Sequence, residues 1–240
     1  MLIDDSMQFV PRPTRDRPLL GQTVLVVEDS RFAGEALRLI CLRSGARIRR
    51  ADSLRSAARH LTTYRPTIVI VDLGLPDGSG LSLLSDLAAA RPRVPAILAI
   101  SGDDTLAGRA TEAGADGFLE KPFGTLSQVQ AELIRLLPQD MQLREPRLVV
   151  EEPISPDRAA LQDDLSLAAS LLDAGTDDPT LSYAAGFVRG LGLCSGDPLL
   201  VTAAQDFMRQ TDHAAAPQRA MLAGMVQERL GRLSKTPLSA

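Results

Sequence analysis

The sequence has few aromatic residues, no tryptophan, two cysteines and only two lysines. Cys41 and Cys194 lie in apolar stretches without a second cysteine or a histidine at metal-binding spacing, so we expect neither zinc nor redox chemistry. The longest apolar runs, such as residues 67–71, are far shorter than a membrane span, and the acidic start MLIDDSMQFV lacks the basic region of a signal peptide. We therefore predict a cytoplasmic protein without a membrane partner.

The overall composition indicates a globular protein and does not favour nucleic acid as a partner, although local basic patches stay possible. The chain has 240 residues, of which 45% are hydrophobic, enough for one large or two modest domains. Its net charge of −4 does not favour contact with nucleic acid phosphates, because such contact requires clustered lysine and arginine.

Residues 21–138 alternate short β-branched apolar runs with helical patterns. The predicted strands are residues 23–27, 46–50, 67–71, 96–100 and 117–120, and the predicted helices begin near Ser30, Ser53, Gly80, Thr105 and Leu126. Five such units predict an α/β fold, a doubly wound parallel sheet with helices on both faces. In that architecture ligands bind outside the carboxyl ends of the strands.

The flanking regions have a different character. Residues 1–20 contain three prolines and no periodicity, which indicates an N-terminal extension, and residues 139–154 are rich in proline and charge, as in a linker. Residues 155–236 favour a small all-α bundle of four short helices. Prolines near the helix starts and acidic or hydroxyl N-cap candidates support this prediction: Pro156, Pro179, Pro198, Pro217, Ser155, Asp178 and Asp197.

Polar residues follow four of the predicted strands. Glu28 and Asp29 follow the first strand, Asp72 the third, Ser101 the fourth and Lys121 the fifth. All would open onto one edge of the sheet, where three carboxylates repel one another unless a cation joins them. Magnesium suits such oxygen ligands, and a lysine suits a phosphoryl oxygen, so the pattern predicts Mg²⁺ and phosphoryl chemistry.

A family resemblance rests on four linked motifs. VLVVEDS, IVIVDLGLPDGSG, ILAISG and GADGFLEKPF resemble, in order and spacing, the receiver domain of two-component response regulators, across roughly residues 22–137. The resemblance implies a five-stranded CheY-like domain in which Asp72 accepts a phosphoryl group from a phosphohistidine on a sensor histidine kinase or a histidine phosphotransfer protein. It implies no enzymatic activity beyond the domain's own phosphorylation and dephosphorylation.

The same resemblance assigns roles to individual residues. Asp29 and Asp72 would bind magnesium through their side chains and Gly74 through its carbonyl, with Glu28 helping through water. Lys121 would pair with phosphoryl oxygens, Ser101 would hydrogen-bond to them, and Phe118 would be the switch aromatic. The bond from Lys121 to Pro122 would be a cis peptide.

Two departures from the family pattern affect these expectations. The segment between Ser101 and Lys121 is about two residues shorter than usual in the family, so we expect a short or irregular fourth helix. Gly74 supplies no side chain to shield a phosphoryl group, so we expect water to reach it easily and the phosphorylated state to be short-lived.

Ordinary structural roles are the alternatives at each position. Asp29 suits a helix N-cap, Asp72 a turn, Ser101 a loop and Lys121 a solvated surface. The joint occurrence of these residues at successive strand ends favours the functional interpretation. For Phe118, a core position and a switch position remain equally open.

The carboxy-terminal helices carry ten acidic against seven basic residues from Ser155 onward, and no recognition helix stands out. Gly186 and Gly190 have a spacing that permits close helix approach or weakens the helix. Three functions remain open. They are a phosphorylation-controlled switch that binds an unidentified output protein or forms a homodimer, a DNA-binding regulator with an atypical helical output, and a phosphoryl shuttle or sink. Packing on the receiver alone is the structural alternative.

Overall fold

The computed structural model describes residues 11–143, 149, 154, 156–175, 177–209 and 216–235. Five parallel strands form a sheet in the order β2-β1-β3-β6-β7, which confirms the predicted fold class. These strands are β1 (Thr23–Val27), β2 (Arg47–Ala51), β3 (Ile68–Asp72), β6 (Ala96–Ser101) and β7 (Gly117–Glu120).

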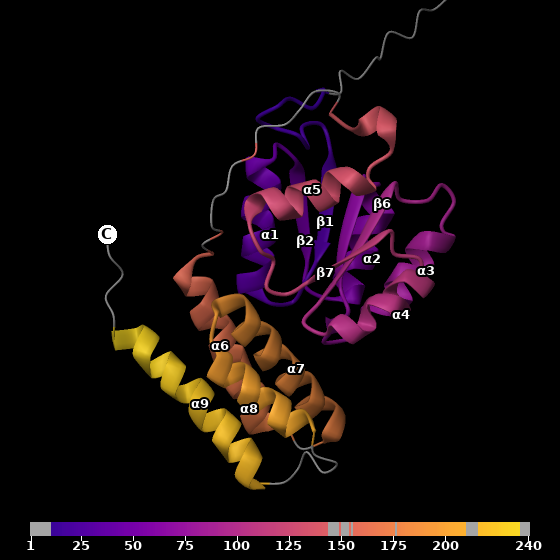
Figure 1. Ribbon diagram of the computed structural model, residues 1–240. Helices are drawn as coiled ribbons and strands as arrows, with labels where there is room; N and C mark the ends of the chain where they lie inside the picture. The colour runs from indigo at the N-terminus through magenta and orange to yellow at the C-terminus, as the bar shows by residue number, and fades with distance from the viewer. Residues whose placement is uncertain are drawn as a thin grey trace, which may run out of the picture.

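Helices cover both faces of this sheet (Figure 1). The helices α1 (Arg31–Arg43) and α5 (Leu126–Leu136) share a core with one face, while α2 (Leu54–Thr63), α3 (Gly80–Ala89) and α4 (Ala107–Glu112) pack on the other. Strand β3 is buried along its whole length, because both of its faces contact helices.

Local sequence explains where these helices begin. Ser30, Ser53 and Thr125 are N-caps whose side chains accept hydrogen bonds from the first turns of α1, α2 and α5. The fourth helix is short, as predicted: a 3₁₀ turn at Asp104–Leu106 leads into the six residues of α4.

Smaller features refine the predicted boundaries. A two-stranded hairpin, β4 (Gly74–Leu75) and β5 (Gly78–Ser79), forms after β3, and a 3₁₀ turn at Gln139–Met141 lies in the predicted linker. Near the end of the predicted N-terminal extension, Leu19 is fully buried and its N–H donates to the Ser44 carbonyl (2.8 Å). This part of the extension is therefore integral to the sheet domain.

The remaining helices form a separate bundle core, and their lengths reach 20 residues rather than being uniformly short. They are α6 (Arg158–Ala174), α7 (Asp178–Ser195), α8 (Pro198–Met208) and α9 (Ala216–Lys235). None of the helices in the described ranges is both long and apolar enough to span a membrane.

The predicted helix caps of the bundle fare differently. Asp197 caps α8 as predicted. The prediction of Asp178 as a cap was wrong: Asp177 caps α7, and its Oδ1 accepts from Thr180 N (2.9 Å), which places Pro179 at the second helical position. With two adjacent aspartates before Pro179, either can be the N-cap, which places the proline at the second or the first helical position. Sequence alone does not choose between them. Ser155 lies outside the described residues, and the prediction that it caps the first bundle helix was wrong, because Asp157 caps α6.

Candidate functional site

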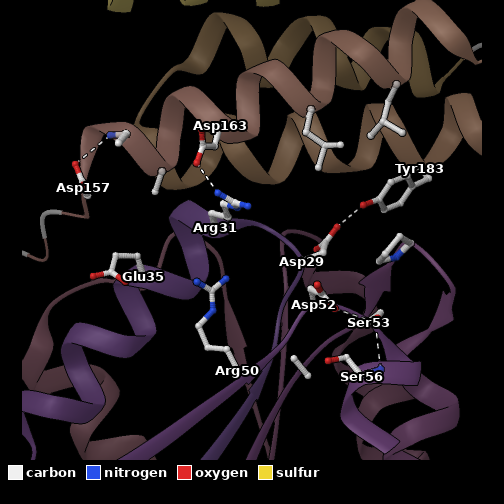
Figure 2. A pocket seen from close by; sticks show the side chains of 16 residues that line it. Asp29, Arg31, Glu35, Arg50, Asp52, Ser53, Ser56, Asp157, Asp163 and Tyr183 are labelled. Atoms are coloured by element: carbon white, nitrogen blue, oxygen red, sulfur yellow. Dashed lines mark hydrogen bonds and ion pairs between the residues drawn. The ribbon is translucent and has the colours of Figure 1, made fainter. Parts of the chain in front are cut away.

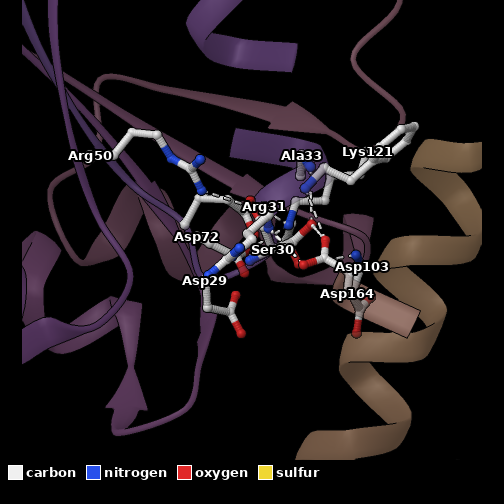
Figure 3. Close-up of polar contacts among 12 residues, drawn as sticks. Asp29, Ser30, Arg31, Ala33, Arg50, Asp72, Asp103, Lys121 and Asp164 are labelled. Atoms are coloured by element: carbon white, nitrogen blue, oxygen red, sulfur yellow. Dashed lines mark hydrogen bonds and ion pairs between the residues drawn. The ribbon is translucent and has the colours of Figure 1, made fainter. Parts of the chain in front are cut away.

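The strand ends bring the predicted polar residues together. Glu28 and Asp29 follow β1, Asp72 ends β3, Ser101 ends β6, and Lys121 follows β7. Because all these strands are parallel, their ends meet at one edge of the sheet, and Figure 3 shows the Asp29, Asp72 and Lys121 side chains there.

A buried lysine joins two of the acids. The Nζ atom of Lys121 lies 2.7 Å from Glu28 Oε2 and 3.3 Å from Asp72 Oδ1, and all three residues are buried. Burial alone lowers the pKa of Lys121, but the negative charges of Asp72 and Glu28 outweigh burial and raise this pKa well above its usual value. The ammonium form is therefore the stable one at this edge.

The negative charge of the three carboxylates at this edge exceeds the positive charge of Lys121. One oxygen each of Glu28, Asp29 and Asp72 lies within 4.8 Å of the others. Burial raises the pKa of Glu28 well above its usual value despite Lys121, and burial together with the charge of Asp72 raises the pKa of Asp29 to about 6.

One buried oxygen in this cluster has no hydrogen bond. Glu28 Oε2 has no hydrogen-bond partner among the described residues, and its contact with Lys121 Nζ, 2.7 Å away, is an ion pair. The hard oxygen donors and the uncompensated charge fit a divalent cation held by Glu28, Asp29 and Asp72.

Helix α6 docks on the first turn of α1 through a buried aspartate (Figure 3). Asp164, only 1% exposed, accepts hydrogen bonds from Ser30 Oγ (2.7 Å), Arg31 N (2.9 Å) and Phe32 N (2.9 Å). Phe32, although part of α1, is buried among core residues of the bundle. The bundle and the sheet domain therefore meet directly beside Asp29.

Helix α7 contributes a tyrosine to the acidic cluster. The Tyr183 hydroxyl donates to Asp29 Oδ2, and burial, followed by the charge of Asp29, raises the pKa of Tyr183. Asp29 and Tyr183 line two cavities, an outer one of about 980 Å³ beside α6 and an inner one of about 230 Å³ above Asp72. Figure 2 shows their hydrogen bond at the boundary of the outer cavity.

The cover formed by α7 limits access to Asp72. Asp72 is only 6% exposed and lines the inner cavity together with residues of α7. Gly74 also lines this cavity, and a Cβ built on it would lie 3.9 Å from Asp72 Oδ2. Position 74 is therefore next to the acceptor, as the sequence predicts, and the short lifetime expected of the phosphorylated state stays a prediction.

Two further predicted residues have defined surroundings. The Ser101 hydroxyl accepts a hydrogen bond from Asp103 N (3.1 Å), which leaves its own O–H as a donor. Phe118 is half-buried and packs against the core shared with α2, α3 and α4, so its position is compatible with both a core and a switch role. The Lys121–Pro122 peptide bond is cis, the isomer that the resemblance implies.

Sequence reasoning missed the contributions of Asp164 and Tyr183. Each residue occupies an ordinary helical position more than 130 residues from its partner. A weak signal existed for Asp164, because the pair Asp163–Asp164 interrupts the apolar pattern of α6.

Comparison with known proteins gives a consistent result for a little less than half of the chain. Residues 24–133 match the model of the response regulator receiver domain. The KDP operon transcriptional regulatory protein KdpE of Escherichia coli is 34% identical over 110 residues, which are 46% of this chain and 48% of KdpE. The virulence transcriptional regulatory protein PhoP of Salmonella typhimurium is 32% identical over 117 residues, 48% of this chain and 51% of PhoP.

A crystal structure of the receiver domain of NtrX from Brucella abortus is also similar. It is 29% identical, with a TM-score of 0.44, and the match covers 48% of this chain and 97% of that chain. The chain spans about half the length of the curated relatives that it matches.

Proposed function

Residues 24–133 form a response regulator receiver domain, and from this premise we propose that Asp72 accepts a phosphoryl group. The observation that carries the proposal is the buried constellation at the sheet edge, in which Lys121 Nζ lies 3.3 Å from Asp72 Oδ1 and two further carboxylates lie within 4.8 Å. The donor would be a phosphohistidine on a sensor histidine kinase or a histidine phosphotransfer protein.

In the proposed transfer, an oxygen of the Asp72 carboxylate attacks phosphorus. The bond from phosphorus to the donor nitrogen breaks, its electron pair stays on the donor, and the new bond is an acyl phosphate. Magnesium held by Glu28, Asp29, Asp72 and the Gly74 carbonyl would supply positive charge to the phosphoryl oxygens. Lys121, whose Nζ lies 3.3 Å from Asp72 Oδ1, would pair with the phosphoryl oxygens, and the Ser101 O–H would donate to them.

The switch proposed for this domain begins at Ser101. When its hydroxyl turns toward the phosphoryl oxygens, Phe118 gains room to move inward, and the surface near β6 and β7 changes. The bundle of α6–α9 contacts the same edge of the sheet through Asp164 and Tyr183. We therefore propose that phosphorylation controls protein–protein contacts of this bundle, with an output protein or a second copy of the chain.

Access to Asp72 adds a requirement. A protein donor needs the aspartate exposed, whereas α7 leaves it only 6% exposed. In this proposal α7 moves aside during transfer from a protein, and a small donor such as acetyl phosphate needs a smaller opening.

The test is phosphorylation of the full chain by acetyl phosphate with magnesium, followed by intact-mass measurement. We expect the mass of one phosphoryl group to be added to the parent protein and to D86N, an exposed control on α3, and no addition to D72N. An unmodified parent chain under conditions that phosphorylate other receiver domains would contradict the proposal.

The names of the curated relatives support a second candidate, a transcriptional regulator. Those similarities cover only the receiver half, so the output must be tested directly. Duplex DNA binding that weakens as salt increases would favour this candidate. A pull-down with beryllofluoride-treated chain that retains a protein partner would favour the interaction switch.

A further inference from the structure

The inner cavity above Asp72 has one wall from the bundle. Helix α7 supplies this wall, and its lining residues are Ser182, Tyr183, Gly186, Phe187, Arg189 and Gly190. A Cβ built on Gly186 or Gly190 meets no atom within 4 Å. Of the two roles that their spacing left open, close helix approach and a weakened helix, this open space does not indicate the first. The two glycines leave the space of the cavity open.

Two cations among the described residues line this cavity, and their surroundings differ. Lys121 is paired with Glu28 and Asp72. The Nε atom of Arg189 is buried and has no hydrogen-bond partner in the described part of the chain. A buried donor without an acceptor is costly, so this guanidinium is poised for an acceptor that enters the cavity.

A phosphoryl group on Asp72 would be such an acceptor. It adds oxygens that accept strong hydrogen bonds, and it increases the negative charge at a site already lined by carboxylates. The planar guanidinium of arginine matches phosphoryl oxygens with two parallel donors, which the lysine ammonium does not offer.

We propose that Arg189 binds the phosphoryl group carried by Asp72, so that the helical bundle contributes a ligand to the receiver's phosphorylated state. The inference rests on the proposed function of Asp72. Its consequence is that phosphorylation tightens the contact between α7 and the sheet edge. Tyr183, which also lines this cavity, donates to Asp29 and so holds α7 beside it.

Beryllofluoride binding to the full chain, measured by titration calorimetry in saturating magnesium, tests this proposal. Because a hydrogen bond to a charged group is worth more than one between neutral groups, we expect R189A to weaken beryllofluoride binding about tenfold. The beryllofluoride affinity of R189K should fall between those of the parent and R189A, because lysine keeps the positive charge but lacks the two parallel N–H donors of the guanidinium. R209A removes an exposed arginine of the bundle and should bind like the parent.

Magnesium affinity measured without beryllofluoride separates this role from a general effect on the acidic cluster. R189A should bind magnesium as tightly as the parent does. Beryllofluoride should also raise the melting temperature of the parent more than that of R189K, which guards against an alanine variant that folds poorly. Parent and R189K with equal shifts, or parent and R189A within twofold in beryllofluoride affinity, would overturn the proposal. A parent chain that binds no beryllofluoride would instead refute the function of Asp72, and this inference with it.

Discussion

Replacing Asp164 by alanine tests whether its carboxylate holds the bundle on the receiver. In the structure this buried group accepts three hydrogen bonds, two of them from the backbone N–H groups of Arg31 and Phe32 in the first turn of α1. Alanine removes all three at once. It also leaves the two N–H groups without the acceptor that Asp164 provides.

The size of the effect follows from opposing contributions. Hydrogen bonds to a charged acceptor contribute roughly 1.5–3 kcal/mol each, so three would sum to at least about 4.5 kcal/mol. Burial raises the pKa of Asp164, although the N–H groups of Phe32 and Arg31 oppose that rise, so desolvation of the carboxylate offsets part of this sum. We expect D164A to weaken docking by about 3 kcal/mol, roughly a hundredfold in the docking equilibrium.

Amide hydrogen exchange of the full chain measures this change at the residues concerned. The Arg31 and Phe32 amides should exchange at least about a hundredfold faster in D164A, because they lose their acceptor and because the bundle undocks more often. D163A is the matched control: Asp163 is half-exposed and pairs with exposed Arg31, so its loss should cost less than about 1 kcal/mol. Equal protection in D164A and D163A would refute the reasoning.

Three further substitutions have defined expectations. F32A should destabilise α6–α9 by about 3 kcal/mol in denaturant unfolding, because the ring lies in the bundle core, and an unchanged bundle transition would contradict this. The hydrogen bond from Arg229 is the main cause that lowers the pKa of Asp197, so the stabilisation by this carboxylate is present at neutral pH and lost as pH falls through the lowered pKa. D197N should therefore be about 1 kcal/mol less stable than the parent at pH 7, and the gap should close below about pH 4; a pH-independent gap would argue against the ion pair. G80A should abolish phosphorylation and lower the melting temperature, because its Cβ would lie 2.1 Å from a backbone oxygen at the end of β3, whereas G108A, with open space, should retain both; equal behaviour of the two variants would oppose this account.

The receiver fold could be predicted from sequence because its signals are local. Apolar runs of five or six residues ending in Asp72 or Ser101 fix both the strand and the side chain that follows it, and parallel order then brings those side chains to one edge. The boundaries moved by one residue at β2, β3 and β6, since neighbouring positions have similar propensities.

The relation between the two halves could not be predicted in the same way. Asp164, Tyr183 and Arg189 acquire their significance only from the docking of α6 and α7 on the sheet edge. That docking depends on contacts between residues far apart in sequence, and no periodicity in α6 or α7 specifies its partner surface. The receiver motifs likewise fix the position of Asp72 but do not indicate that a helix covers it.

The position of Phe32 has a consequence for separating the two halves. A fragment that ends after α5 would expose this aromatic ring on its surface. A fragment that starts at α6 would have a cavity in its core at the position of the ring. Separation therefore exposes apolar surface on the receiver and removes a core side chain from the bundle. Grafting these four helices onto a foreign receiver would require an aromatic residue at the matching point of its first helix.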